Sequence, residues 1–394
     1  MSRHLRTILS LDDFEHAARR LLPRPVFAYV SGGVETDASL RDNRAAFDEL
    51  GFIPRVLVDV SKRTTGTTLF GREYSAPFGI APMGISALSA YRGDLVQAAG
   101  AKASNIPMIM SGSSLIPLEE VCAQSPQTWF QAYLPGEEAK IVGLVERAAA
   151  AGFKTLVVTV DVAVLSNREN NVRAGFSTPL RPSLRLAWDG ITHPRWLFGN
   201  ALRTVVKHGM PHFENSFATR GAPILARDVE RDFSKKDHLN WDHLAIIRRR
   251  WQGRLVVKGV MNPLDARIAR DNGVDGLIVS NHGGRQLDYT VSPLRVLSSI
   301  IEAAGGIPVM MDSGMRRGTD VMKALALGAA FVWVGRPFNY AAAIAGEAGV
   351  RHACEILQGE LYRGMAQLSI TSLAQLAPAM LMRIGGVRAP GMPV

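Results

Sequence analysis

The chain has 394 residues, of which 47% are hydrophobic and 20% are charged. This ordinary globular composition excludes wholesale disorder, a collagen-like repeat and a coiled coil. The 45 Lys and Arg residues outnumber the 35 Asp and Glu residues, so the formal net charge is +10. Such a balance favours an anionic partner: nucleic acid, an acidic membrane surface, or a small molecule that carries phosphate or carboxylate.

The cysteines and the N-terminal residues further restrict the class of protein. Cys122 and Cys354 lack metal-site spacing and cannot build a disulfide framework, which favours a reducing compartment and predicts no metal site. The first 20 residues mix basic side chains with Asp12, Asp13 and Glu15, unlike a secretory signal. Because no run of 18 apolar residues occurs, we expect any membrane contact to be peripheral.

In chain order, the first predicted element is a helix that Ser10 and Asp13 cap and that ends at Pro23. From residue 76 onward, short apolar runs alternate with Ala-rich helical stretches. The runs are 77–82, 106–111, 129–133, 155–161, 255–258, 276–280, 308–312 and 331–335. Because they are continuously apolar, they are typical of buried parallel strands. Helices are predicted among them at 137–151, 263–272, 293–304 and 319–326.

Eight strand–helix units predict an α/β fold of the (β/α)8 TIM barrel class, preceded by an N-terminal helical segment. A doubly wound sheet is the competing architecture. The count of eight and the missing glycine-rich dinucleotide turn after the first strand favour the barrel. We expect residues 1–394 to form a single domain.

A long insertion separates the fourth and fifth predicted strands, at residues 170–241, and is predicted to be an elaborated loop on the C-terminal rim. Between residues 173 and 220 it has seven Lys or Arg residues against two Asp or Glu, a net charge of +5. Its interleaved large aromatics are Trp188, Trp196, Phe198, Phe213 and Phe217. This mixture suits an acidic membrane surface, but an active-site lid with a solvated basic face explains it equally well.

Polar residues stand at the ends of the predicted strands, where a barrel places its active site. They are Ser111, Gln131, Tyr133, Thr159, Asp161, Lys258, Ser280, His282, Asp312 and Arg336. A cap or a solvated charge explains any one of them, but so many at one face predict a single site.

The clearest local pattern is S-N-H-G-G-R-Q-L-D, from Ser280 to Asp288. His282 can act as a base near neutral pH, and Arg285 can offer a planar guanidinium to a carboxylate. A turn with a phosphate-binding arginine is the alternative. Further residues after the last two strands predict a phosphate grip: Gly314, Arg316, Gly335 and Arg336. The residues alone therefore predict a barrel enzyme that holds a phosphorylated cofactor or substrate beside a His/Arg pair.

From about Leu11 to Leu373 the sequence resembles the FMN-dependent L-2-hydroxy acid oxidase and dehydrogenase family. That family includes glycolate oxidase and the membrane-associated bacterial dehydrogenases of L-lactate and (S)-mandelate. Besides the run at 280–288, the matching motifs are D-S-G-x-R-R-G-x-D at 312–320, A-L-A-L-G-A at 324–329, W-F-Q-x-Y at 129–133 and V-K-G at 257–259.

The resemblance implies FMN at the C-terminal mouth of the barrel. The cofactor-binding residues that it implies are Pro82, Met83, Gly84, Ser111, Gln131, Thr159, Lys258, Ser280, Asp312, Gly314, Arg316, Gly335 and Arg336. The flavin ring would lie along the backbone of residues 82–84. Lys258 would place a fixed cation beside it, which stabilises an anionic reduced flavin.

The resemblance also implies the chemistry. The implied catalytic residues are His282, Asp161, Tyr133, Arg285 and Lys258, and the implied substrate-binding residues are Tyr29, Tyr133, Arg168, His282 and Arg285. His282 would initiate oxidation of the α-carbon as a base, and Asp161 would stabilise the resulting imidazolium. Carbanion and hydride routes both need this base.

Two departures from the oxidases bear on the substrate. Ser113 stands where glycolate oxidase has Trp, so we expect a wider pocket, and Val162, Ala163 and Val164 are similar to mandelate dehydrogenase. The expected activity is oxidation of an L-2-hydroxy acid of the L-lactate or (S)-mandelate class to the 2-keto acid, with electrons passed to a membrane quinone. An oxidase that reduces O2 to hydrogen peroxide is the alternative.

The expected setting is the cytoplasm, with peripheral contact at the inner face of the cell membrane, and a homo-oligomer, specifically a tetramer. We expect no nucleic-acid partner, because the mixture of aromatic and basic residues is confined to one insertion and no recognised binding module occurs. A phosphate-binding isomerase or aldolase barrel would leave His282, Arg285 and Lys258 unexplained.

Overall fold

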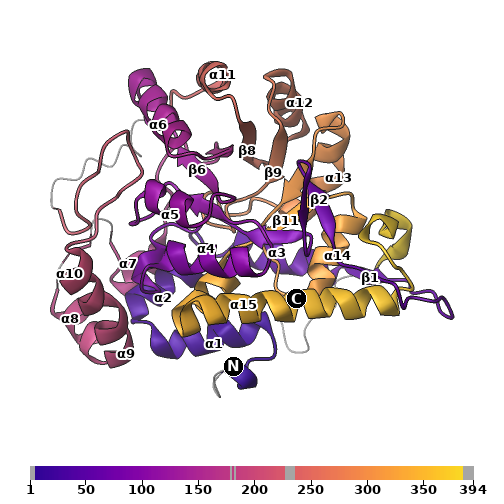
Figure 1. Cartoon of the computed structure of the whole chain (residues 1–394), viewed down its shortest axis with the longest axis horizontal. Helices are drawn as coiled ribbons and strands as arrows, with labels where there is room; N and C mark the ends of the chain where they lie inside the picture. The colour runs from indigo at the N-terminus through magenta and orange to yellow at the C-terminus, as the bar shows by residue number, and fades with distance from the viewer. Residues whose placement is uncertain (1–4, 178–179, 182, 227–235, 385–394) are drawn as a thin grey trace.

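A computed structural model describes residues 5–177, 180–181, 183–226 and 236–384 of the chain. Eight parallel strands form the central sheet in the order β4–β11–β10–β9–β8–β7–β6–β5 (Figure 1). A parallel bridge between Ile80 and Met108 joins the two ends of this order, so the sheet curls into a nearly closed barrel. The predicted (β/α)8 barrel is confirmed, and the doubly wound sheet is wrong, because an open sheet would leave both ends apart.

Each of the eight predicted apolar runs corresponds to one strand, and only β8 extends beyond its run, at both ends. The strands are β4 (Phe78–Ile80), β5 (Ile109–Ser111), β6 (Trp129–Tyr133), β7 (Thr155–Thr159), β8 (Arg254–Val260), β9 (Gly276–Val279), β10 (Val309–Met311) and β11 (Phe331–Val334). Several are shorter than the run that predicted them. The polar residues Asp161, Ser280 and Asp312 therefore lie just beyond their strands, at the mouth of the barrel.

Helices follow the strands and cover the outside of the barrel (Figure 1). They are α4 (Gly93–Ala103), α5 (Leu118–Gln124), α6 (Glu138–Ala150), α11 (Trp241–Arg250), α12 (Pro263–Asp271), α13 (Pro293–Ala304), α14 (Gly318–Ala326) and α15 (Arg336–Gln367). The four predicted helices become α6, α12, α13 and α14, with each end within one residue of its predicted place. Helix α15 is kinked at Ala345 and Gly346.

The N-terminal segment contains η1 (Leu5–Thr7), α1 (Leu11–Leu21), α2 (Arg24–Ser31) and α3 (Ala38–Asp48). The predicted cap of α1 is confirmed: Ser10 Oγ accepts a hydrogen bond from the Asp13 amide (3.3 Å), and Asp13 Oδ2 accepts one from the Ser10 amide (2.9 Å). Helix α1 packs on α15, while strand β1 (Leu50–Phe52) pairs with β12 (Leu381–Arg383) beside the barrel.

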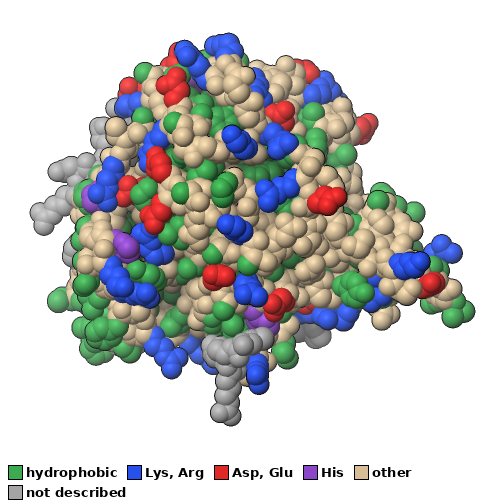
Figure 2. Space-filling model, in the orientation of Figure 1, with side chains coloured by type: hydrophobic (Ala, Val, Ile, Leu, Met, Phe, Trp, Pro, Cys, Tyr) green, Lys and Arg blue, Asp and Glu red, His purple; other side chains and the backbone are tan. Residues whose placement is uncertain are grey.

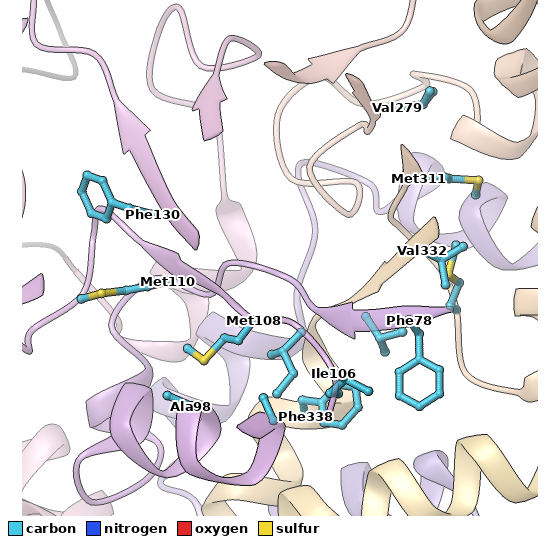
Figure 3. Close-up of a cluster of buried hydrophobic side chains, with 14 of the residues drawn as sticks. Phe78, Ala98, Ile106, Met108, Met110, Phe130, Val279, Met311, Val332 and Phe338 are labelled. Carbon is cyan, nitrogen blue, oxygen red and sulfur yellow. The ribbon is translucent and has the colours of Figure 1, made fainter. Parts of the chain in front are cut away.

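Two hydrophobic layers hold the barrel together. The layer inside it consists of Leu69, Tyr74, Ala81, Ile109, Trp129, Val157, Val256, Ile278, Met310, Phe331 and Trp333. The hairpin of β2 (Thr67–Leu69) and β3 (Arg72–Tyr74) closes the N-terminal end of the strands. The second layer lies between strands and helices, where Phe78 faces Phe338 and Met108 lies near Ala98 (Figure 3). Because the N-terminal end is filled, the C-terminal mouth is left for a site.

The predicted elaborated insertion has its helices before residue 209 and a largely irregular backbone from 209 to 226; residues 178–179, 182 and 227–235 of it lie outside the described part. It contains α7 (Glu169–Ala174), α8 (Leu184–Ile191), α9 (Pro194–Trp196), the π-helical turn η3 (Leu197–Leu202) and α10 (Arg203–His208). Trp196 Nε1 and Asn200 Nδ2 both donate to the Leu88 carbonyl oxygen, at 2.6 and 2.9 Å, and dock the insertion on the barrel.

The five aromatics of the insertion do not share one environment. Trp188 and Phe198 are 67% and 66% exposed, whereas Phe213 is buried and Trp196 and Phe217 are partly buried. Sequence spacing could not distinguish the buried aromatics from the exposed ones, because the packing of the insertion on the barrel decides which side of each helix is covered. Among the described residues, no helix combines the length and the apolar character needed to cross a bilayer.

Candidate active site

A cavity of about 480 Å³ opens at the C-terminal ends of the barrel strands. The predicted site residues that line it are Tyr29, Pro82, Met83, Gly84, Tyr133, Thr159, Arg168, Lys258, His282, Arg285, Asp312, Gly314, Arg316, Gly335 and Arg336. The other four predicted site residues lie behind the residues that line the cavity; they are Ser111, Gln131, Asp161 and Ser280. The structure thus brings the whole predicted set to one place.

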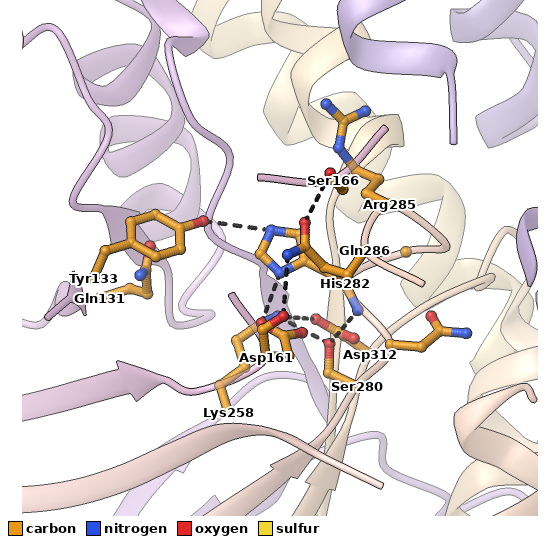
Figure 4. Close-up of polar contacts among 12 residues, drawn as sticks. Gln131, Tyr133, Asp161, Ser166, Lys258, Ser280, His282, Arg285, Gln286 and Asp312 are labelled. Atoms are coloured by element: carbon orange, nitrogen blue, oxygen red, sulfur yellow. Dashed lines mark hydrogen bonds and ion pairs between the residues drawn. The ribbon is translucent and has the colours of Figure 1, made fainter. Parts of the chain in front are cut away.

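His282 is held in a defined orientation at the centre of the cavity (Figure 4). Its Nδ1 lies 2.9 Å from Asp161 Oδ1, and its Nε2 lies 3.4 Å from the Tyr133 hydroxyl oxygen. Because a carboxylate can only accept, Nδ1 carries the proton and donates it, which leaves Nε2 as the basic nitrogen. The Ser280 hydroxyl oxygen accepts from the His282 amide (3.0 Å), where the backbone takes a left-handed φ of +58°.

The charges around His282 favour its neutral form at rest. Burial, together with the cations Lys258 and Arg168, lowers the pKa of His282, although Asp161 opposes this change. Burial would raise the pKa of Asp161, but the imidazole facing it and nearby Lys258 lower this pKa overall. The pair therefore rests as a neutral imidazole beside a carboxylate, which is the arrangement that a general base needs.

Lys258 is a buried cation in the wall of the cavity. Its Nζ donates to Ser280 Oγ (2.9 Å) and forms an ion pair with Asp312 Oδ2 (3.1 Å). Burial works to lower the pKa of Lys258, but Asp312 and Asp161 raise it above its usual value. The ammonium group is therefore charged throughout the physiological range. Asp312, predicted only as a cofactor contact, holds that charge in place.

Arg285 and Arg168 lie beside His282 at the same wall. Arg285 Nη1 donates to the carbonyl oxygens of Tyr29 (2.7 Å) and Gly32 (2.8 Å), which fixes the guanidinium plane. Arg168 Nη2 donates to Gln286 Oε1 (2.7 Å), and its Nε donates to the Arg285 carbonyl oxygen (3.3 Å). Burial and the neighbouring Arg168 lower the pKa of Arg285 to about 9, so it remains charged at neutral pH.

The residues opposite His282 suit a flavin ring. Gln131 Nε2 and Thr159 Oγ1 are buried and have no hydrogen-bond partner among the described residues. Unpaired buried polar atoms cost free energy, so a ligand that pairs with them is expected, and the polar edge of a flavin ring offers both donors and acceptors. Nearby, Ser111 Oγ donates to Gln131 Oε1 (3.2 Å) and accepts from the Ser113 amide (3.1 Å).

The end of the cavity near β10 and β11 suits a phosphate. Gly314 has a φ of +86°, and a Cβ there would lie 2.1 Å from the Asn43 carbonyl oxygen, so only glycine lets α3 approach this closely. Arg316 lines the same end, where Asp12 and Glu15 lie 3.5 and 3.7 Å from its guanidinium nitrogens. Exposed glycine backbone and arginine are the donors that phosphate sites use.

Arg336 has a structural task that the sequence did not predict. Its Nε donates to the Val30 carbonyl oxygen (2.8 Å), and its Nη2 donates to those of Gly32 and Gly283 (both 3.0 Å). Two of its three guanidinium nitrogens thus join the end of α2 to the turn after His282. Since it also lines the cavity, Arg336 can fix this turn and contribute positive charge there.

Sequence reasoning missed several residues that line the site, among them Gln286, Phe176 and Phe213. Gln286 Nε2 donates to the Asp161 carbonyl oxygen (3.0 Å), so Gln286 joins Asp161 to Arg168. Its place within the run at 280–288 was the available signal. Phe176 and Phe213 of the insertion are buried and line the cavity. Their sequence separation from the strands offered no signal, because only folding brings the insertion over the mouth.

Comparisons with known proteins agree with this geometry. A family model described as FMN-dependent dehydrogenase matches residues 18–383. The chain is 35% identical to the (S)-mandelate dehydrogenase of Pseudomonas putida over 96% of this chain and 95% of that protein. It is 38% identical to an L-lactate dehydrogenase of Ectopseudomonas mendocina (strain ymp), over 94% of this chain and 98% of that protein.

A solved structure of (S)-mandelate dehydrogenase, described as a monotopic membrane protein, has a TM-score of 0.87 to this chain at 34% identity. The match covers 96% of this chain and 100% of that one. The mouth of this TIM barrel brings together a partly buried His–Asp pair, a fixed lysine cation and candidate phosphate contacts, which is an arrangement that fits a flavin-dependent oxidoreductase. The chain belongs to the FMN-dependent dehydrogenase family, and its cofactor is FMN. The expected family and cofactor are confirmed.

Proposed function

We propose that this enzyme oxidises an L-2-hydroxy acid of the L-lactate or (S)-mandelate class to the 2-keto acid. The observation that carries the proposal is the His282–Asp161 pair in one cavity with the fixed guanidinium of Arg285. An arginine beside a base suits a substrate whose carboxylate is adjacent to the reacting carbon. The activities named for the two relatives support the same substrate class.

In this proposal each side chain has one task. Arg285 and Arg168 bind the substrate carboxylate, and Tyr29 and Tyr133 orient its oxygens. His282 Nε2 takes a proton from the substrate, and Asp161 stabilises the imidazolium that results. FMN supplies the acceptor for the two electrons that the α-carbon loses. Its ring contacts would be residues 82–84 with Ser111, Gln131, Thr159 and Lys258, and its phosphate contacts would be Gly314, Arg316, Gly335 and Arg336.

We further propose that the enzyme lies on a membrane and transfers the electrons of the oxidised substrate to a quinone in that membrane. Leu184, Trp188 and Val206 are 93%, 67% and 83% exposed on α8 and α10. Figure 2 shows hydrophobic side chains gathered over these helices at the lower left, with Lys and Arg side chains close by. Apolar side chains among cations suit the interface of an acidic bilayer, and the description of the relative as a monotopic membrane protein supports membrane contact.

The inner face of the cell membrane and a tetrameric assembly belong to the same proposal. The reducing compartment inferred from the two cysteines supports the cytoplasmic side, and both cysteines are buried as free thiols. Sedimentation of the purified holoenzyme in detergent would measure the assembly directly, and a monomer would contradict the tetramer.

A panel of L- and D-2-hydroxy acids tests the function. The purified enzyme should reduce an artificial acceptor with L-lactate or L-mandelate, release the 2-keto acid and leave the D-isomers unreacted. Turnover with O2 should be slow, and stoichiometric hydrogen peroxide would instead establish the oxidase alternative. Absence of 2-keto acid from every L-substrate would contradict the proposed class.

A further inference from the structure

The cavity has an apolar opening that the proposed chemistry does not use. Val164, Leu165 and Val172 line the cavity and are 58%, 61% and 76% exposed, so they stand where it meets solvent. We call these three residues the apolar mouth. The carboxylate and the α-carbon of a hydroxy acid need the arginines and His282 rather than aliphatic side chains that are more than half exposed, and exposed aliphatic groups cost free energy in water. The apolar mouth therefore indicates that a second, apolar ligand binds at the site.

The mouth lies next to helix α8 of the insertion, which carries exposed apolar side chains. Val172 lies on α7, and Arg185 Nη2 of α8 donates to the Arg173 carbonyl oxygen (3.2 Å), so the two helices touch beside it. Helix α8 carries the exposed side chains of Trp188 and Ile191. The exposed side chains of Arg173 and Arg185 lie at this junction, so a molecule that resides among lipid chains would reach the mouth beside cations that an acidic leaflet attracts.

Polar groups adjoin the aliphatic ones at the mouth. Ser166, Asn167 and Asn171 line the same part of the cavity. Hydroxyl and amide groups can donate hydrogen bonds to carbonyl oxygens, while the aliphatic side chains contact a ring or an isoprenoid tail. This combination matches a quinone, which has two ring carbonyls on an otherwise apolar body.

We propose that Val164, Leu165 and Val172 form the docking site for the ring and proximal tail of a lipid-soluble quinone. The proposal rests on the proposed function for its source of electrons. The hydroxy acid gives up two electrons and two protons to become the keto acid, and the quinone takes up two electrons and two protons to become the quinol. The two half-reactions balance, and bound FMN would supply the redox chemistry that links them.

The test compares two double variants of the holoenzyme. Leu165→Ser with Val172→Ser removes aliphatic surface from the mouth. Val56→Ser with Leu264→Ser is the matched control, since these residues are 77% and 59% exposed and do not line the cavity. We expect the mouth variant to raise KM for decylubiquinone at least tenfold. Its KM for hydroxy acid and its kcat with ferricyanide should stay within twofold of wild type, as should every parameter of the control.

Equilibrium dialysis of decylubiquinone against the oxidised holoenzyme gives a readout besides turnover, and binding should weaken in the mouth variant alone. Unchanged binding and KM would overturn the proposal. A raised KM for hydroxy acid with ferricyanide would also overturn it, by placing the mouth in the substrate pocket. If wild type fails to oxidise hydroxy acids with any acceptor, the proposed function fails, while dialysis still decides whether the mouth binds quinone.

Discussion

The basicity of one imidazole nitrogen decides whether the reaction can begin. His282 Nδ1 is committed to Asp161, so only Nε2 can take the substrate proton. Replacing His282 with Gln keeps a polar side chain but removes the basic nitrogen. We expect kcat to fall by about 10²–10⁴-fold, the usual contribution of a general base, while flavin absorbance is retained. Steady-state assays with an artificial acceptor would measure this, and near-normal turnover would exclude His282 as the base.

The pKa of His282 predicts the pH dependence. Because this pKa is lowered from 6.5, the neutral base persists below pH 6.5, and kcat/KM should fall only at more acidic pH. Asp161→Asn removes the charge that holds this pKa up. The acid limb of the variant should therefore move to lower pH while its plateau drops, because the imidazolium loses its counter-charge. A pH profile of kcat/KM from 4.5 to 8 checks both, and an acid limb that moves upward would contradict this account.

Asp94 is a buried carboxyl group that takes no part in the proposed reaction. Its Oδ2 accepts a hydrogen bond from Ser86 Oγ (2.7 Å), and burial raises its pKa from 3.8 to about 6. A raised folded-state pKa adds stability that is fully present below pH 3.8 and is lost as pH rises through 6.

Asp94→Asn should therefore remove a pH-dependent contribution to the free energy of unfolding. Relative to the variant, wild type should lose up to roughly 3 kcal/mol between pH 4 and pH 8. Urea unfolding of both proteins at each pH isolates this difference from the other titrating groups. A difference that stays constant with pH would mean that Asp94 titrates normally.

At the scale of elements, the insertion combines two tasks in one segment. Phe176 and Phe213 line the cavity, and the Asn215 Oδ1 accepts from the buried Leu118 amide (2.9 Å). The parts of the insertion on either side of α8, η3 and α10 therefore belong to the site, whereas α8 and η3 carry the exposed Trp188 and Phe198, and α10 carries the exposed Val206. Removing the whole stretch from 173 to 220 would open the active site as well as change the surface.

Replacing only residues 184–208 with a short polar linker should separate the two tasks. That segment contains four Lys or Arg residues against one Asp, and each cation near an acidic leaflet contributes about 1 kcal/mol. We expect the variant to shift from the vesicle-bound to the free fraction in flotation with acidic vesicles, while turnover with a soluble acceptor is retained. Equal flotation of both proteins would leave the plain lid as the explanation.

At the scale of the whole molecule, the barrel places residues from distant parts of the chain in one cavity. Tyr29 comes from α2, His282 from the turn after β9, and Phe213 from the insertion. The hydrophobic layer inside the barrel and the β2–β3 hairpin fill the opposite end, so within the described part of the chain the barrel opens to a ligand at its C-terminal mouth.

The sequence by itself determined the barrel and the identity of its polar strand ends. Both depend on local pattern: continuous apolar runs predict buried strands, and the residue after each run must reach the mouth. Sequence alone also identified His282, Arg285 and Lys258, because they sit in short, specific motifs.

Only the tertiary structure decided which partners those side chains have. Asp312 forms an ion pair with Lys258, and Gln286 links Asp161 to Arg168 by hydrogen bonds. Two guanidinium nitrogens of Arg336 donate hydrogen bonds to backbone carbonyl oxygens. Tertiary packing likewise exposed Trp188 while it turned Trp196 toward Leu88. These outcomes depend on contacts between residues far apart in the chain. A one-dimensional pattern does not contain them, because the facing surface of each element is chosen only when the elements pack.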